Sequence, residues 1–245
     1  MNRLEAPASL PQFRSLPALG IVGALRWEVA PLLRKLEGVK RIGPRRFAFL
    51  LGGEPAVLAI CGMGMENAGQ AAEELARSFR LRGLLMLGFA GALTDSLRRG
   101  DVVLAEQVIQ QSTGERFDCR TDLLPVRCTH RGTLLMTDRV IRSAGEKRRL
   151  GKDWGALAVD TESAGVARAA ARAGLPFAAV RSITDASGQS IFIDFERCRR
   201  DDGQLSIWRI VREGMTTPHG VRNLYGLARA SRQAAASLAG AFGAI

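Results

Sequence analysis

Two carboxylates follow directly on an apolar run in the segment Val159-Asp160-Thr161-Glu162-Ser163. The apolar run before it and the Ala-rich run after it predict a strand-to-helix junction. Asp160 or Thr161 could cap that helix, and Glu162 could complement its dipole. The functional alternative places Glu162 at the open end of the strand, where it would face the hydroxyl groups of a ligand.

A second mostly apolar run, the segment 180–186 (VRSITDA), closes on the polar pair Thr184 and Asp185. An aspartate at this position is often a turn former. It could equally be a general acid that gives a proton to a leaving group. Local sequence leaves both interpretations open.

Two glycine clusters also follow apolar runs. Gly62, Gly64 and Gly69 have the spacing G-x-G-x-x-x-x-G, which differs from the dinucleotide-binding pattern, and no P-loop is present. This cluster favours a tight strand-to-helix turn, whose helix N-terminus could contact an anion. The segment 88–92 (GFAGA) favours a plain turn, although small residues at a strand end also allow a ligand to approach.

Other catalytic chemistries find little support. The four cysteines form no C-x-x-C pair and the only histidines are His130 and His219, so we expect reduced thiols and no zinc site. No G-x-S-x-G elbow occurs, and both histidines lie among polar residues, which argues against a Ser-His-Asp hydrolase.

The composition narrows the class of protein further. A net charge of +11 is compatible with nucleic acid, anionic membrane or phosphate-bearing partners. An aromatic content of 6% leaves few platforms on which bases could stack, so nucleic acid is not favoured. No secretory signal or membrane-spanning run is seen, and a cytoplasmic protein is expected.

Strands and helices alternate along the chain in the pattern of an α/β fold with parallel strand pairs. A length of 245 residues fits one domain (1–245), with a flexible lead-in over 1–15 and a basic helical tail over 204–245. The predicted strands are 19–25, 46–51, 56–60, 84–87, 101–109, 133–137, 156–159 and 177–183. The predicted helices are 27–36, 66–80, 161–173 and two in the tail, parted at 216–218.

Taken in order, five stretches between residues 19 and 190 resemble the nucleoside phosphorylase/nucleosidase superfamily. They are LGIVGALRWEV, CGMGMENAG, LGFAGALTDSLRRGDVVLA, AVDTESAGVA and PFAAVRSITDAS. The front of the chain resembles 5′-methylthioadenosine/S-adenosylhomocysteine nucleosidases. The stretch MTDRVIRSAGEKRRL and the basic tail are more similar to hopanoid-associated phosphorylases.

This resemblance implies a three-layer sandwich around a twisted mixed sheet. It also implies cleavage of the N-glycosidic bond of a purine nucleoside, with a 5′-substituted adenosine as substrate and adenine as product. Asp185 would protonate purine N7, Glu28 would help to activate the attacking water, and Glu162 would bind the ribose hydroxyls. The remaining expected substrate-binding residues are Thr161, Phe89, Ala90, Gly91, Val140, Ile141 and Thr184.

No metal or organic cofactor is implied, and phosphate is the alternative nucleophile and co-substrate. The resemblance further implies a homo-oligomer, with a dimer as the first expectation. The chain departs from the nucleosidase pattern at Thr161, where methionine is usual, and at Arg26, while the Gly-Asp-Pro-rich loop of phosphorylases is absent. These departures favour water over phosphate only slightly.

Two further hypotheses rest on the basic residues. One is a non-catalytic nucleic-acid-binding or regulatory protein on the same fold. The other is peripheral contact of the tail with an anionic membrane, at the inner face, through its apolar residues and arginines. The alternative for the tail is that Leu224, Leu227 and Leu238 pack on the core. We expect the basic clusters at 139–152 and 197–232 to lie away from most of the site.

Overall fold

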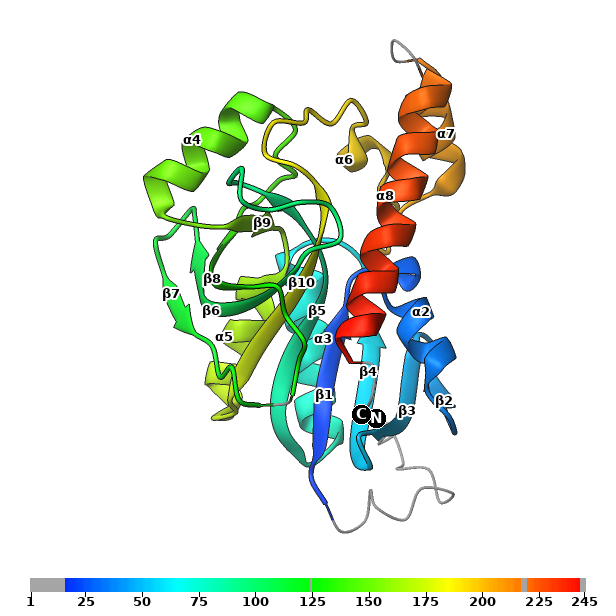
Figure 1. Cartoon of the computed structure of the whole chain (residues 1–245). Helices are drawn as coiled ribbons and strands as arrows, with labels where there is room; N and C mark the ends of the chain where they lie inside the picture. The colour runs from blue at the N-terminus through cyan, green and yellow to red at the C-terminus, as the bar shows by residue number, and fades with distance from the viewer. Residues whose placement is uncertain (1–15, 124, 217–219, 243–245) are drawn as a thin grey trace.

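The computed structural model describes residues 16–123, 125–216 and 220–242, which fold around a ten-stranded mixed sheet with helices on both faces (Figure 1). The strands are β1 (Ala18–Gly23), β2 (Lys40–Gly43), β3 (Arg46–Leu51), β4 (Glu54–Ile60), β5 (Leu81–Ala92), β6 (Val102–Gln110), β7 (Arg116–Asp118), β8 (His130–Met136), β9 (Ala158–Asp160) and β10 (Phe177–Asp185). The helices are α2 (Arg26–Lys35), α3 (Met65–Ser78), α4 (Ala144–Trp154), α5 (Ser163–Ala173), α6 (Phe195–Cys198), α7 (Ile207–Met215) and α8 (Gly220–Ala241).

One half of the sheet is built around β1, which pairs in parallel with both β4 and β5. Its residues alternate between two cores: Val22 packs with α3 and α5 on one face, and Ile21 packs with α2 and α8 on the other. A strand buried on both faces is expected to be apolar throughout, as β1 is. The helix pairs α3–α5 and α2–α8 thus form the two outer layers of the fold.

In the other half, the strands β5, β10, β6, β8 and β9 close into a ring. β10 pairs in parallel with β5 and antiparallel with β6, β8 pairs in parallel with β6 and β9, and β9 returns antiparallel to β5. The strand β5 belongs to both halves, so it connects the ring to the open sheet. The ends of β9 and β10 are therefore held against the end of β5, where the candidate residues lie.

The predicted α/β fold with a central mixed sheet is confirmed. The hairpin of β3 and β4 and the helices α2, α3 and α5 lie where they were expected. The short elements β2, β7 and α6 and the polar helix α4 were not predicted, because their residues show no strong apolar periodicity. The expected lead-in over residues 1–15 lies outside the described residues.

The tail forms two helices, α7 and α8, as predicted, although the expected break includes residues outside the described part of the chain. Leu238 is fully buried in the core between α8, α2 and the sheet, and Leu224 and Leu227 pack against a smaller cluster around Ile210. The packing role of these leucines is confirmed. Within the residues that the structure describes, no helix is both long enough and apolar enough to cross a membrane.

Candidate functional site

A large pocket of about 1700 Å³ opens at the ends of β5, β9 and β10 and continues between α2, α7 and α8. Every residue that the sequence assigned to the site lines this pocket. They are Glu28, Phe89, Ala90, Gly91, Val140, Ile141, Thr161, Glu162, Thr184 and Asp185. The fold therefore brings together residues from five separate stretches of the chain.

Glu162 is buried at the entrance to α5, and its carboxylate is held by three donors. Its Oε1 accepts hydrogen bonds from the Gly64 backbone N–H at 3.0 Å and from the Thr161 hydroxyl at 2.5 Å, and its Oε2 lies 3.4 Å from Arg181 Nη2. Burial raises the pKa of Glu162, and the nearby guanidinium opposes that rise. Glu162 is thus fixed in the pocket wall and does not cap the helix with its side chain.

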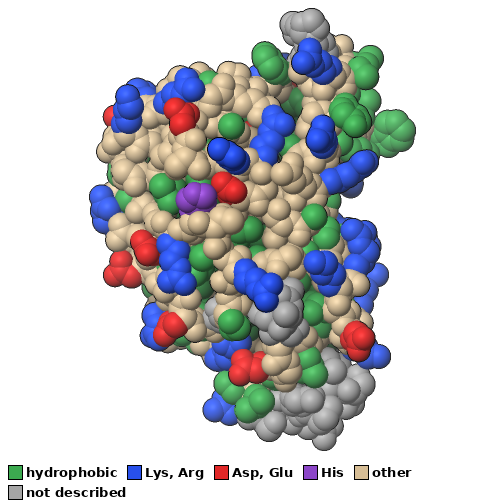
Figure 2. Space-filling model, in the orientation of Figure 1, with side chains coloured by type: hydrophobic (Ala, Val, Ile, Leu, Met, Phe, Trp, Pro, Cys, Tyr) green, Lys and Arg blue, Asp and Glu red, His purple; other side chains and the backbone are tan. Residues whose placement is uncertain are grey.

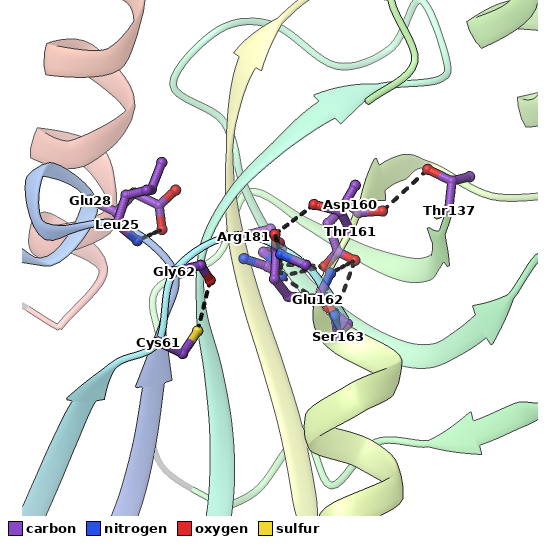
Figure 3. Close-up of polar contacts among 11 residues, drawn as sticks. Leu25, Glu28, Cys61, Gly62, Thr137, Asp160, Thr161, Glu162, Ser163 and Arg181 are labelled. Atoms are coloured by element: carbon purple, nitrogen blue, oxygen red, sulfur yellow. Dashed lines mark hydrogen bonds and ion pairs between the residues drawn. The ribbon is translucent and has the colours of Figure 1, made fainter. Parts of the chain in front are cut away.

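Asp160 takes the capping role at the same junction. Its Oδ1 accepts from the backbone N–H groups of Glu162 and Ser163, and its Oδ2 accepts from the Ser163 hydroxyl (Figure 3). Side-chain acceptors of this kind satisfy the unpaired N–H groups of a first helical turn. Of the capping residues that the sequence left open, Asp160 therefore takes this role.

Arg181 joins the two carboxylates and was not predicted as a site residue. It is fully buried on β10; its Nε donates to Asp160 Oδ2 at 2.7 Å, and its Nη2 lies 2.6 Å from the same oxygen. A charge inside an apolar strand that is buried on both faces must be paired. This rule was the signal in the sequence from which Arg181 could have been found.

Glu28 lies in the first turn of α2 and is 5% exposed. Its Oε2 accepts from the Leu25 backbone N–H at 3.4 Å. Burial raises the pKa of Glu28 to about 8, because removal of a carboxylate from water disfavours its charged form; Arg181 lowers the pKa and Glu162 raises it. With this pKa the Glu28 carboxyl group is mostly protonated at pH 7 and half-ionised near pH 8.

The glycines of the segment 88–92 lie inside β5 and not in a turn, so the turn interpretation is wrong. A Cβ atom on Gly88 would lie 2.5 Å from Arg181 Nη1 and 2.6 Å from Glu28 Oε2. A Cβ atom on Gly91 would lie 2.9 Å from Asp185 Oδ2. Only a residue without a side chain allows these charged groups to approach the strand so closely.

The first glycine cluster, by contrast, is the strand-to-helix turn that its spacing favoured. Gly62 and Gly64 adopt φ values of 92° and 100°, which glycine tolerates best, and Gly69 packs against the backbone of Gly165 where α3 and α5 meet. The turn also contributes to the site, because the Gly64 N–H holds Glu162.

Asp185 ends β10 just after an irregularity in its pairing with β5. Ile183 pairs with Ala90 and Asp185 with Gly91, so Thr184 is an extra residue of the kind that forms a bulge. Bulges re-aim side chains and are common next to functional sites. The Thr184 hydroxyl donates to Asp185 Oδ1 at 2.6 Å, and Lys147 Nζ donates to Asp185 Oδ2.

Several arginines also line the pocket, contrary to the expectation that the basic clusters lie away from the site. They are Arg34, Arg99, Arg139, Arg222, Arg229 and Arg232. The expectation failed because distance along the chain does not report distance in space once α8 folds back against α2. Part of the positive charge therefore faces the pocket mouth.

The cysteines take no visible part in this chemistry. All four are free; Cys198 is buried and Cys61, Cys119 and Cys128 are half-buried. Burial raises the pKa of Cys119 to about 12 and also raises that of Cys61, so neither is a thiolate at neutral pH. No group of His, Cys, Asp and Glu side chains suited to a metal ion occurs in the described ranges.

A mixed α/β sheet that gathers buried carboxylates and a deep pocket at its strand ends is typical of enzymes that act on a small ligand. The chain belongs to the phosphorylase superfamily, whose family model matches residues 18–127 and 120–206. The helices α7 and α8 lie beyond this match.

Curated relatives and solved structures agree with this assignment. A 5′-methylthioadenosine/S-adenosylhomocysteine nucleosidase of Mycobacterium bovis is 28% identical over 228 residues, which cover 73% of this chain and 89% of the relative. The nucleosidase of the same name from Neisseria meningitidis has a TM-score of 0.65 at 20% identity and covers 91% of this chain and 98% of its own. Futalosine hydrolase of Helicobacter pylori has a TM-score of 0.68 at 16% identity and covers 93% and 96%. At such identities the structural likeness establishes the fold.

Proposed function

We propose that this protein cleaves the N-glycosidic bond of a purine nucleoside, a 5′-substituted adenosine, and releases adenine. The observation that carries the proposal is the meeting of Asp185 with Glu162 and Glu28 in one pocket. Two curated relatives, each 28% identical to this chain, are named as 5′-methylthioadenosine/S-adenosylhomocysteine nucleosidases, which supports the choice of substrate class.

Each carboxyl group has a distinct part in the proposed reaction. Breaking the bond passes through an oxocarbenium-like state, by analogy with glycoside hydrolysis, and this state needs an acid for the leaving group and negative charge near the sugar. Asp185 would protonate purine N7, and Glu162 would bind the ribose hydroxyls. Glu28 would accept a proton from the attacking water.

We propose water as the nucleophile because of the charges on the Glu28 side of the pocket. Glu28 and Glu162 are both buried there, and Arg181 is already paired with Asp160 and Glu162. Arg181 Nη1 has no hydrogen-bond partner among the described residues and approaches Gly88 beside Glu28 Oε2. A water held by these two groups would satisfy the guanidinium and lie beside Glu28, whereas a phosphate dianion would have to compete with Asp160 and Glu162 for the same guanidinium.

The raised pKa of Glu28 predicts an acidic limb in the pH profile. A general base acts only when it is deprotonated, so kcat/KM should rise about tenfold per pH unit below pH 8 and level off above it. The measurement is initial-rate kinetics on 5′-methylthioadenosine between pH 5.5 and 9.5, for the wild-type chain and Glu28→Gln. Glu28→Gln should lose most of its activity, and its pH profile should lack the acidic limb. A wild-type profile that is flat from pH 6 to 8 would contradict the assignment of Glu28 as the general base.

The part of the pocket that is lined by α7 and α8 supports a large apolar 5′ substituent on the substrate. Beyond the catalytic residues the pocket continues along apolar side chains of α7 and α8, among them Ile210, Val211, Leu224 and Leu227. A volume of about 1700 Å³ exceeds the roughly 300–1,000 Å³ of ordinary small-ligand sites. We propose a substituent of hopanoid type, in keeping with the resemblance of this region to hopanoid-associated phosphorylases.

An exposed apolar surface on α7 and α8 supports peripheral contact with an anionic membrane. Trp208 is 81% exposed and Val221 70%, and Ile207, Met215 and Tyr225 are exposed beside them (Figure 2). Between residues 207 and 242 the chain has a single acidic residue, Glu213, against arginines at 209, 212, 222, 229 and 232. Apolar side chains among arginines match a bilayer with negative headgroups.

This contact predicts flotation of the full chain with phosphatidylglycerol-containing vesicles in a density gradient. Trp208→Ser combined with Ile207→Ser should abolish flotation, since both side chains are exposed and the core is untouched. The exposed Trp27→Ser, on α2, is the matched control. Flotation that is equal for all three proteins would reject the surface, and a concentration-dependent dimer lost in the double variant would show instead that a second copy covers it.

One assay tests the proposed function directly. The chain is incubated with adenosine, inosine, 5′-methylthioadenosine and S-adenosylhomocysteine, with and without phosphate, and the base and sugar products are identified by mass. Release of adenine together with a free ribose derivative would support hydrolysis. Release of adenine together with a ribose 1-phosphate derivative would show that phosphate, and not water, is the nucleophile. Release of no base from any substrate would reject the proposal.

We also propose that the protein is a homo-oligomer, with a dimer as the first expectation, and that it is cytoplasmic. Light scattering tests the oligomeric state.

A further inference from the structure

Lys147 is a lysine whose side chain is completely buried next to the proposed acid. It lies on α4, and its Nζ donates to Asp185 Oδ2, to the Gln189 carbonyl at 2.8 Å and, at 3.5 Å, to the Ala186 carbonyl. An ammonium group has three hydrogens and no acceptor. All three point to Asp185 and to the loop that follows it, so the ammonium links α4 to this loop.

The hydrogen bonds around Asp185 complement its charged form. Lys147 donates to Oδ2 and the Thr184 hydroxyl donates to Oδ1, at 2.6 Å. When the C1′–N9 bond breaks, its electron pair passes to the purine, N7 takes the proton from Asp185, and Asp185 becomes a carboxylate. The two donors therefore bind best the state that exists after proton transfer, which is how fixed charges accelerate a reaction.

We propose that Lys147 is a positioning residue for the leaving-group acid, an inference that rests on the proposed function. It holds the Asp185 carboxyl and the loop 186–189 at the base and balances the negative charge that Asp185 acquires. Lys147 keeps its own protons throughout. The loop residues Gly188 and Gln189 line the same pocket, so the ammonium fixes the acid and part of the base-binding wall together.

Stability alone does not account for this lysine. A buried ion pair is often no more stabilising than apolar residues of similar volume, because both charges lose their hydration. The neighbouring buried residue on the same face of α4, Leu150, shows that apolar side chains can fill this layer. A methionine would therefore suffice at position 147 if only packing were required.

The test compares two leaving groups in Lys147→Met. Adenine must be protonated as it leaves 5′-methylthioadenosine, whereas nitrophenolate leaves p-nitrophenyl β-D-ribofuranoside without a proton. We expect kcat for 5′-methylthioadenosine to fall about 10²-fold, the loss typical of a misplaced catalytic group, and nitrophenolate release to fall far less. Lys152→Met, exposed on the same helix, is the control and should match wild type on both substrates.

A second comparison shows whether Lys147→Met loses activity only because it misfolds. Asp185→Asn with Lys147→Met leaves no unpaired buried charge, and in this background the lysine change should cost no further activity, because it acts through Asp185. Equal losses on both substrates, or full activity of Lys147→Met on 5′-methylthioadenosine, would overturn the inference. No adenine release by the wild-type chain would count against the proposed function and remove the basis of this inference with it.

Discussion

Asp185→Asn should lower kcat for adenine release by roughly 10²- to 10⁴-fold, the contribution typical of a positioned general acid. The asparagine amide is nearly the same size as the carboxyl group but has no proton to give to N7. KM should change little, because the amide can still accept a hydrogen bond from Lys147, which donates to Asp185 Oδ2 in the wild-type chain. The measurement is a steady-state assay of adenine release by chromatography.

The matched control for this variant is Asp153→Asn, which neutralises an exposed carboxylate on α4 that lies 3.9 Å from Arg149. It should leave both kcat and the thermal unfolding temperature unchanged. If Asp185→Asn keeps more than a tenth of wild-type turnover while it remains folded, Asp185 is not the leaving-group acid.

Arg181→Met should destabilise the folded protein by about 3–5 kcal/mol, the usual cost when one partner of a buried ion pair is removed. The methionine roughly fills the volume, but Asp160 and Glu162 would remain buried and lose their shared cation. Adenine release should fall as well, because Glu162 is held in the pocket wall partly by this guanidinium. Urea unfolding followed by circular dichroism measures the first effect.

Two comparisons make this result specific. Arg149→Met removes an arginine on α4 that pairs with Asp153 at the surface, and such pairs contribute only about 0–1 kcal/mol. Adding Asp160→Asn to Arg181→Met should recover part of the lost stability, since one uncompensated charge disappears. A free energy of unfolding for Arg181→Met within about 1 kcal/mol of wild type would refute the pairing, because loss of a buried partner costs more.

The candidate residues that were predicted from the sequence all line one pocket, whereas the helix α4, which packs beside it, was not predicted. Asp185 and Glu162 were singled out because each stands at the end of an apolar strand, a position that local pattern reveals, whereas Glu28 followed only from the resemblance to the nucleosidases. The α/β fold followed from the same alternation. What local pattern could not reveal was whether Asp160 or Thr161 caps the helix at the β9–α5 junction, because both side chains can do so. In the fold the Thr161 hydroxyl is bound to Glu162, and Asp160 accepts from the backbone N–H groups.

The residues that were not predicted, among them Lys147 and Gly64, lie outside the two strand ends that carry Glu162 and Asp185. Lys147 lies in a polar stretch, and its ammonium group is held by the carbonyls of Ala186 and Gln189 in the loop after β10, far along the chain. The Gly64 N–H contributes through its backbone, for which no side-chain pattern exists. The glycines of β5 were taken for a turn, because the charged groups that require them, Arg181 and Asp185, come from a strand far along the chain.

The ring formed by β5, β10, β6, β8 and β9 determines how the protein loses its site when it unfolds. Within a closed ring every strand is hydrogen-bonded on both sides, so no strand can peel away alone. Asp185 ends one of these strands, and Glu162 follows another by two residues. The proposed proton donor and the proposed sugar-binding carboxylate therefore belong to one cooperative unit. Heat or denaturant should remove both at once, and partly unfolded molecules with low activity should not accumulate.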